Sequence, residues 1–107
     1  MKKYSLPFVN DGKPFELPPW TVIRHEAAIN KCMEAVKGKS PEFQDKELRF
    51  YVILESLQVI DDSVTIQQIK EMHVDDMLAL FEEAYNAGKR GILFQEQPPG
   101  KSKKSKE

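Results

Sequence analysis

The sequence predicts a mainly α-helical domain of about four helices arranged around a central apolar helix. Apolar residues recur at three- and four-residue steps in three segments, and a fourth segment is apolar nearly all round. Serine or threonine stands where three of the helices would begin, and glycine or an acidic turn stands where helices would end. The amino-terminal stretch lacks this spacing, so we expect a small β-hairpin or an extended segment there.

Size and composition indicate one domain rather than two. A second domain in a chain of 107 residues would leave about fifty residues for each core. The content of 40% hydrophobic and 31% charged residues is typical of folded globular chains. We therefore expect a single helical domain over residues 1–94, followed by a disordered basic tail over residues 95–107, which has nothing to bury.

The cysteine count and the lack of long apolar runs exclude several classes of protein. Cys32 alone cannot form an internal disulfide or a four-cysteine zinc site. No apolar run approaches the roughly eighteen residues that a membrane helix requires, and the first residues lack the apolar core of a signal peptide. We expect a soluble protein that stays in the cytoplasm and has no membrane partner.

Residues 4–18 are expected to form an arm of two short extended segments. These are Tyr4 to Val9 and Lys13 to Leu17, around the turn-forming run Asn10-Asp11-Gly12. Each segment contains a proline, which cannot donate to a β-ladder, so the strands would be edge or irregular strands. Trp20 follows two further prolines, and we expect it to pack as an anchor between this arm and the helices.

The first helix is expected from Thr21 to Val36. Thr21 can cap its start, and Gly38 stands just beyond its end. The helical spacing predicts that one face points into the core, with the residues Val22, Ile29, Cys32, Met33 and Val36.

The second helix is expected to be the central one. The run Ser40-Pro41-Glu42 signals its start, with serine at the cap, proline at the first position and an acid in the first turn. We expect it to extend to about Leu57. Its stretch from Phe50 to Leu54 is apolar nearly all round, whereas a surface helix would show a single stripe.

Two further helices are expected after the run Asp61-Asp62-Ser63 ends the central one. Thr65 and Gln68 form a capping-box pair that starts a helix of about two turns. The last helix is expected over about Val74 to Ala87, with two acids in its first turn and Gly88 as its stop. Its predicted inward residues are Val74, Met77, Leu78, Phe81, Ala84 and Tyr85.

Residues suited to catalysis or metal binding are few. His25 and Cys32 would lie about 10 Å apart along a helix, too far for the contact of about 3 Å between a nucleophile and its base. We expect His25 to be a hydrogen-bonded packing residue, and His73 to close or cap the junction before the last helix. The pair Asp61-Asp62 lacks the glycine and glutamate of a calcium loop, and the glycines form no phosphate loop. The sequence therefore predicts no enzyme, no cofactor and no metal site.

Charge is unevenly distributed along the chain. Residues 101–107 hold four lysines and one glutamate, for a net charge of +3, whereas residues 55–83 hold eight acids against Lys70, for −7. Such an acidic surface repels nucleic acid, so we expect no specific nucleic-acid partner. The tail either keeps the chain solvated or contacts an acidic partner through Lys101, Lys103, Lys104 and Lys106.

Three motifs follow one another in an order that resembles a known family. The first is a proline-flanked tryptophan in the run Phe15 to Thr21, and the second is a Phe-Tyr-Val helix in the run Arg49 to Leu54. The third is Val64-Thr65-Ile66, leading to the run Met72 to Phe81. Together they resemble the tail assembly chaperones of long-tailed bacteriophages and related prophages, over about residues 4–92.

The resemblance implies a function as well as a fold. Members of that family are small, mainly helical and not enzymes. They bind the tape measure protein, a very long and largely helical chain, and keep it soluble until the tail tube protein polymerises around it. The resemblance therefore implies a non-catalytic chaperone in the cytoplasm of the bacterial host, with the tape measure protein and the tail tube protein as partners. It also implies that the protein is missing from the mature virion.

A chaperone of this kind needs apolar surface for exposed helices of its partner. Large apolar residues on the central and last helices are candidates for that surface, although each also suits the core: Tyr51, Ile53, Leu80 and Tyr85. Three other functions fit the sequence. One is a small acidic adaptor or antitoxin-like regulatory protein that binds a basic partner, another is a minor structural component of a virion, and the last is an accessory subunit of a metabolic enzyme.

Overall fold

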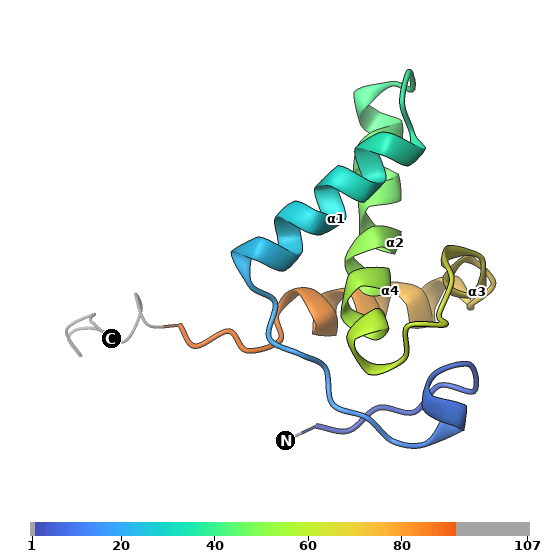
Figure 1. The fold of residues 1–107 in the computed structure, drawn as a ribbon, viewed down its shortest axis with the longest axis vertical. Helices are drawn as coiled ribbons and strands as arrows, with labels where there is room; N and C mark the ends of the chain where they lie inside the picture. Colours follow the sequence, from blue (N-terminus) through green and yellow to red (C-terminus); the bar gives the residue numbers. More distant parts are fainter. Residues whose placement is uncertain (1, 92–107) are drawn as a thin grey trace.

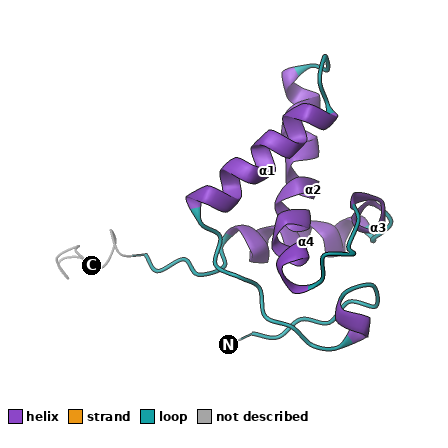
Figure 2. Cartoon of the chain, in the orientation of Figure 1, coloured by secondary structure: helices purple, strands orange, loops and turns teal. Residues whose placement is uncertain are grey.

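The computed structural model describes residues 2–91 and contains four α-helices after a short 3-10 turn (Figure 1). No strand forms within this part of the chain (Figure 2). The predicted mainly helical class is therefore confirmed, and the expected tail at residues 95–107 lies outside the described residues. The elements are η1 (Asn10–Gly12), α1 (Val22–Ala35), α2 (Pro41–Ile60), α3 (Ile66–Lys70) and α4 (Val74–Tyr85).

Helix α2 is the central helix, as the sequence predicts. Helix α1 lies alongside it, α4 crosses it, and α3 also contacts it (Figure 1). The Ser40 side chain accepts a hydrogen bond from a backbone N–H of the first turn, and Pro41 occupies the first helical position. The helix ends at Ile60, whereas the sequence analysis expected an end near Leu57.

The predicted amino-terminal caps of the other helices are confirmed. Thr21 Oγ1 accepts a hydrogen bond from a backbone N–H in the first turn of α1. Thr65 and Gln68 make both bonds of the capping box, at 2.9 and 3.3 Å. His73 caps α4, because its Nδ1 accepts a hydrogen bond of 3.1 Å from the backbone N–H of Asp75.

Two helices are shorter than expected. Helix α3 has 5 residues, fewer than two turns, because the chain turns at Glu71 to enter the next cap. Helix α4 ends at Tyr85 rather than Ala87. The Asn86 side chain donates a hydrogen bond of 2.9 Å to the carbonyl of Glu82 and thereby satisfies a carbonyl of the last turn.

The amino-terminal arm, residues 4–18, is extended but forms only one antiparallel bridge. Tyr4 and Phe15 exchange two backbone hydrogen bonds of 2.8 Å, and η1 makes the turn between the two extended segments. Pro7 and Pro14 lack the N–H groups that further rungs of a ladder would need. The expected hairpin is therefore reduced to a bridged pair of extended segments.

The larger part of the core joins the arm to α2, α3 and α4. The arm contributes Val9, which is fully buried, and Phe15, so it is an integral part of the core. The buried residues of this cluster are Val9, Phe15, Ile53, Leu54, Leu57, Val64, Ile69, Met77 and Leu80.

A smaller part of the core joins α1, α2 and α4 through Ala28, Val52 and Ala84. Trp20 packs against this cluster, as predicted, and its backbone N–H donates a hydrogen bond of 2.8 Å to the carbonyl of Ala87. Both parts of the core are contacted by three partly buried residues, which connect them: Leu17, Tyr51 and Phe81.

The buried face of α1 differs from the prediction. Ala28, Cys32 and Val36 are buried and lie four residues apart along the helix. Val22 and Met33, which the spacing placed inward, are 74% and 55% exposed. The prediction was based on large apolar side chains. In the structure, the small side chain of Ala28 lets α1 pack closely against α2, so the contact is centred on the side of α1 that carries Ala28.

We predict that Leu57→Ala destabilises the fold by about 2–5 kcal/mol, because it opens a cavity at a fully buried position of α2. Val59 is 50% exposed on the same helix, so Val59→Ala should change the free energy of unfolding by less than about 0.5 kcal/mol. Urea unfolding followed by tryptophan fluorescence measures both values. Equal effects of the two substitutions would contradict the central position of α2.

We also predict that Gly88→Ala is more damaging than Gly38→Ala. Both glycines have positive φ, 78° and 84°, where a side chain costs about 1–2 kcal/mol. A Cβ at Gly38 meets no atom within 4 Å, but at Gly88 it would lie 2.7 Å from the Cβ of Pro19. Urea unfolding should therefore show an additional loss of about 1–3 kcal/mol for Gly88→Ala. Equal losses would mean that Pro19 moves away without cost.

Candidate protein-interaction surfaces

One side of α4 exposes apolar side chains that the sequence analysis placed inward. Val74, Leu78 and Tyr85 are 57%, 39% and 49% exposed. The apolar residues of this helix occupy an arc too wide for its neighbours to cover, so part of the arc faces outward. The buried residues of α4 are Met77, Leu80 and Ala84.

The exposed residues form a continuous side of the helix. Val74, Leu78, Phe81 and Tyr85 follow one another at steps of four, three and four residues, which places them on one side of α4. Phe81 is partly buried and connects this side to the core. We call these four residues the α4 flank.

A row of aromatic rings connects the α4 flank to the start of α1. The ring centroids of Phe81 and Tyr85 are 5.8 Å apart, those of Tyr85 and His25 are 5.9 Å apart, and those of His25 and Trp20 are 6.0 Å apart. Trp20 Nε1 donates a hydrogen bond of 3.3 Å to His25 Nδ1. His25 is therefore a hydrogen-bonded packing residue, as predicted, and the row holds the Tyr85 ring in place.

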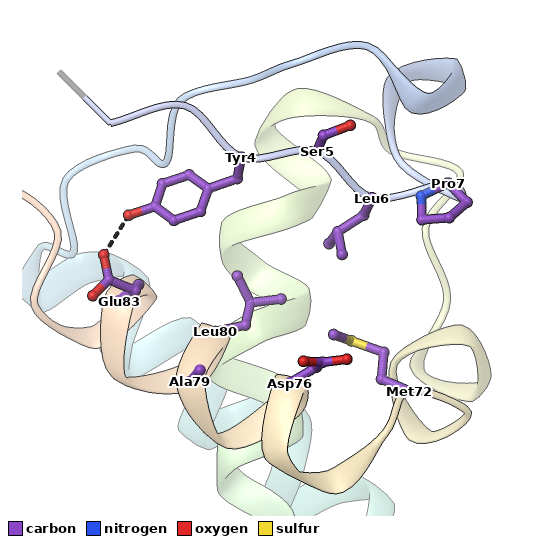
Figure 3. A pocket seen from close by; sticks show the side chains of 9 residues that line it. All are labelled: Tyr4, Ser5, Leu6, Pro7, Met72, Asp76, Ala79, Leu80 and Glu83. Atoms are coloured by element: carbon purple, nitrogen blue, oxygen red, sulfur yellow. Dashed lines mark hydrogen bonds between the residues drawn. The ribbon is translucent and has the colours of Figure 1, made fainter.

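A groove of about 470 Å³ lies between the arm and α4 (Figure 3). An adjoining hollow of about 400 Å³ continues it toward α3 and shares four lining residues with it. We call the two hollows together the arm groove. The side chains drawn in Figure 3 line its larger part: Tyr4, Ser5, Leu6, Pro7, Met72, Asp76, Ala79, Leu80 and Glu83.

A polar clasp holds the arm against α4 at one end of this groove. The phenol of Tyr4 donates a hydrogen bond to Oε1 of Glu83 (Figure 3), and Lys2 Nζ lies 3.0 Å from the same oxygen. Burial, the hydrogen bond to Glu83 and the charge of that carboxylate raise the pKa of Tyr4 to about 12. The hydrogen bonds from Tyr4 and then from Lys2 lower the pKa of Glu83.

The turn of the arm is attached to the end of α2 as well. The backbone N–H of Asn10 donates a hydrogen bond of 2.9 Å to Oδ2 of Asp61. Hydrogen bonds from the Ser63 hydroxyl and then from the Asn10 backbone lower the pKa of the Asp61 carboxyl. The arm is thus held at its start and at its turn, and these contacts position its wall of the groove.

The four described residues that the sequence proposed for partner binding lie in different environments. Ile53 is fully buried and Leu80 is 7% exposed. Both belong to the core, which corrects the expectation that they offer surface. Tyr51 is partly buried between the two parts of the core, and burial raises the pKa of its phenol. Tyr85 lies on the surface, in the α4 flank.

The other proposed contacts, Lys101, Lys103, Lys104 and Lys106, lie outside the described residues. Sequence reasoning missed Val74 and Leu78 as surface residues, although the width of the apolar arc on α4 was a signal for them. It also missed the arm groove, because its walls come from opposite ends of the described chain.

Within residues 2–91, no group of three or more histidine, cysteine or acidic side chains could hold a metal ion. Cys32 is buried, and its Sγ donates to the carbonyl of Gln44 at 3.5 Å. Burial first, and then the nearby carboxylates of Glu47 and Asp45, raise the pKa of this thiol, so the reactive thiolate is disfavoured. No helix in the described range is long and apolar enough to cross a membrane.

Compared with protein-family models, with curated proteins and with solved structures, the chain matches none of them.

We predict that Tyr4→Phe changes how stability depends on alkaline pH. The folded chain keeps the Tyr4 proton up to about pH 12, whereas an unfolded tyrosine loses it near pH 10.0. The contribution of Tyr4 to the free energy of unfolding is therefore complete below pH 10.0 and is lost as pH rises through about 12. Urea unfolding at about pH 8 and about pH 11 should show a smaller alkaline loss in Tyr4→Phe than in the wild type. Equal losses would contradict the clasp.

Proposed function

We propose that this protein is a non-catalytic tail assembly chaperone of a long-tailed phage or prophage. In this proposal it binds the tape measure protein and keeps that chain soluble in the host cytoplasm during tail assembly. The observation that carries the proposal is the α4 flank, a side of one helix on which three large apolar side chains are exposed. The family resemblance over about residues 4–92 supplies the identity of the partner.

The spacing of the α4 flank suits a helical partner. Side chains at steps of three and four residues make the stripe into which the apolar face of a second helix packs. The Tyr85 ring is supported by Phe81 and His25, so it loses little side-chain freedom when a partner covers it. A rigid aromatic ring of this kind is a typical anchor of a protein interface.

The charge of α4 supports a chaperone that must itself stay soluble. The helix carries Asp75, Asp76, Glu82 and Glu83 and no lysine or arginine. Repulsion between copies opposes self-association through the exposed apolar residues. Asp75 and Glu82 lie next to the α4 flank on the helix and favour partner helices that carry basic residues beside their apolar face.

The proposal also includes the tail tube protein as a second partner and departure before the virion is complete. The resemblance is the support for both. Immunodetection should find the protein in infected or induced cells and not in purified particles. A constant copy number in particles would favour the minor structural component instead.

A second candidate function, an acidic adaptor or antitoxin-like regulator, is favoured by the same four carboxylates of α4. It would bind a basic partner mainly through charge, and its complex would dissociate at high salt. A complex held by the α4 flank would persist, because apolar burial does not weaken with added salt. Salt dependence of the purified complex therefore separates the two.

We predict that coexpression with a helical segment of the cognate tape measure protein moves that segment into the soluble fraction. Leu78→Glu should reduce the soluble amount by at least about tenfold, because it places a charge in the middle of the α4 flank. Val59→Glu is the matched control, since Val59 is a similarly exposed apolar residue of α2 outside the flank. Circular dichroism checks that both variants are folded.

Two results would contradict the chaperone proposal. One is that several different segments stay insoluble with the wild type, and the other is that Leu78→Glu and Val59→Glu act alike.

A further inference from the structure

The arm groove has an apolar floor that no residue of the described chain fills. Leu6 and Pro7 of the arm, Met72 after α3, and Ala79 and Leu80 of α4 line its larger hollow (Figure 3). The adjoining hollow shares Leu6, Pro7 and Met72. The two hollows therefore form one continuous trough along the arm, large enough for more than one apolar side chain.

The groove is preformed. The Tyr4–Glu83 clasp and the Tyr4–Phe15 bridge hold one end of the arm, and the Asn10–Asp61 hydrogen bond holds its turn. A partner would meet walls already in position, which lowers the free-energy cost of binding.

The acidic side chains Asp76, Glu83 and Glu71 are among the residues that line the groove. Asp76 is exposed and lines both hollows. No hydrogen bond or ion pair involves its carboxylate in the described part of the chain, in contrast to Glu83, which the clasp occupies. Glu71 lines the second hollow, and no lysine or arginine lines either one. An apolar floor beside an unpaired carboxylate complements apolar side chains accompanied by a basic one.

We propose that the arm groove is a docking site for a protein segment that places apolar side chains in the trough and a lysine or arginine against Asp76. This site is separate from the α4 flank, because Asp76 and Ala79 lie on a different side of α4 from Val74 and Leu78. It goes beyond the proposed function and does not depend on the identity of the tape measure protein. A partner that engages both surfaces would bind more tightly than either surface allows.

The experiment uses the full chain and two fluorescein-labelled peptides, one of leucine and lysine and its twin of leucine and glutamate. Fluorescence anisotropy should show that the lysine peptide binds at least about tenfold more tightly than the glutamate twin. Asp76→Lys should weaken this binding by at least about tenfold. Asp75→Lys is the matched control, because it reverses a charge in the same first turn of α4 at a residue that does not line the groove.

A second variant tests the trough itself. Ala79 is exposed on the groove side of α4, so Ala79→Trp fills the larger hollow without disturbing the core or the net charge. Binding of the lysine peptide should again fall by at least about tenfold. Circular dichroism verifies that each variant keeps its helical content.

Several results would overturn the proposal. Among them are no binding of the lysine peptide, equal losses for Asp75→Lys and Asp76→Lys, and unchanged binding by Ala79→Trp. A further variant tests whether the chain's own lysines occupy the groove. In it, glutamine replaces Lys101, Lys103, Lys104 and Lys106. If this variant binds the peptide more than about tenfold more tightly, the chain's own basic end competes for the groove, and the site is intramolecular.

Discussion

A helix with apolar side chains on most of its circumference needs several neighbours, and this constraint shapes the whole molecule. Between Phe50 and Leu54, helix α2 has apolar side chains on nearly all sides and no side that suits full exposure to water. Helix α1 covers it through Ala28, helix α4 crosses it, and α3 and the arm complete the enclosure. Helix α3 and the arm would not be stable without the apolar surface of α2.

The two candidate interaction surfaces follow from how α4 meets that requirement. A helix that crosses α2 can bury only one side, here centred on Leu80, so the excess of its apolar arc becomes the α4 flank. The side of α4 that lies away from the α4 flank faces the arm. Because the arm forms a single β-bridge, it does not close over the helix, and the arm groove remains between them. Both surfaces thus follow from the geometry of the core.

The order and starts of the helices could be predicted, because caps such as Thr65 and proline at Pro41 act locally. The buried faces could not be placed as well. Periodicity weights large side chains, whereas the close helix contacts here are made by Ala28 and Ala84. The arm groove lay beyond prediction, because the Tyr4–Glu83 pair joins residues 79 positions apart and no local pattern signals such a contact.

That long-range pair bears on how the protein matures. Synthesis proceeds from the amino terminus, so Tyr4 leaves the ribosome long before Glu83 is made. Contacts of such high sequence separation form late in folding. The arm is therefore synthesised before the helix that holds it, and a nascent chain that ends before α4 lacks the arm groove. Only chains that include α4 have the groove in which we propose that a partner docks.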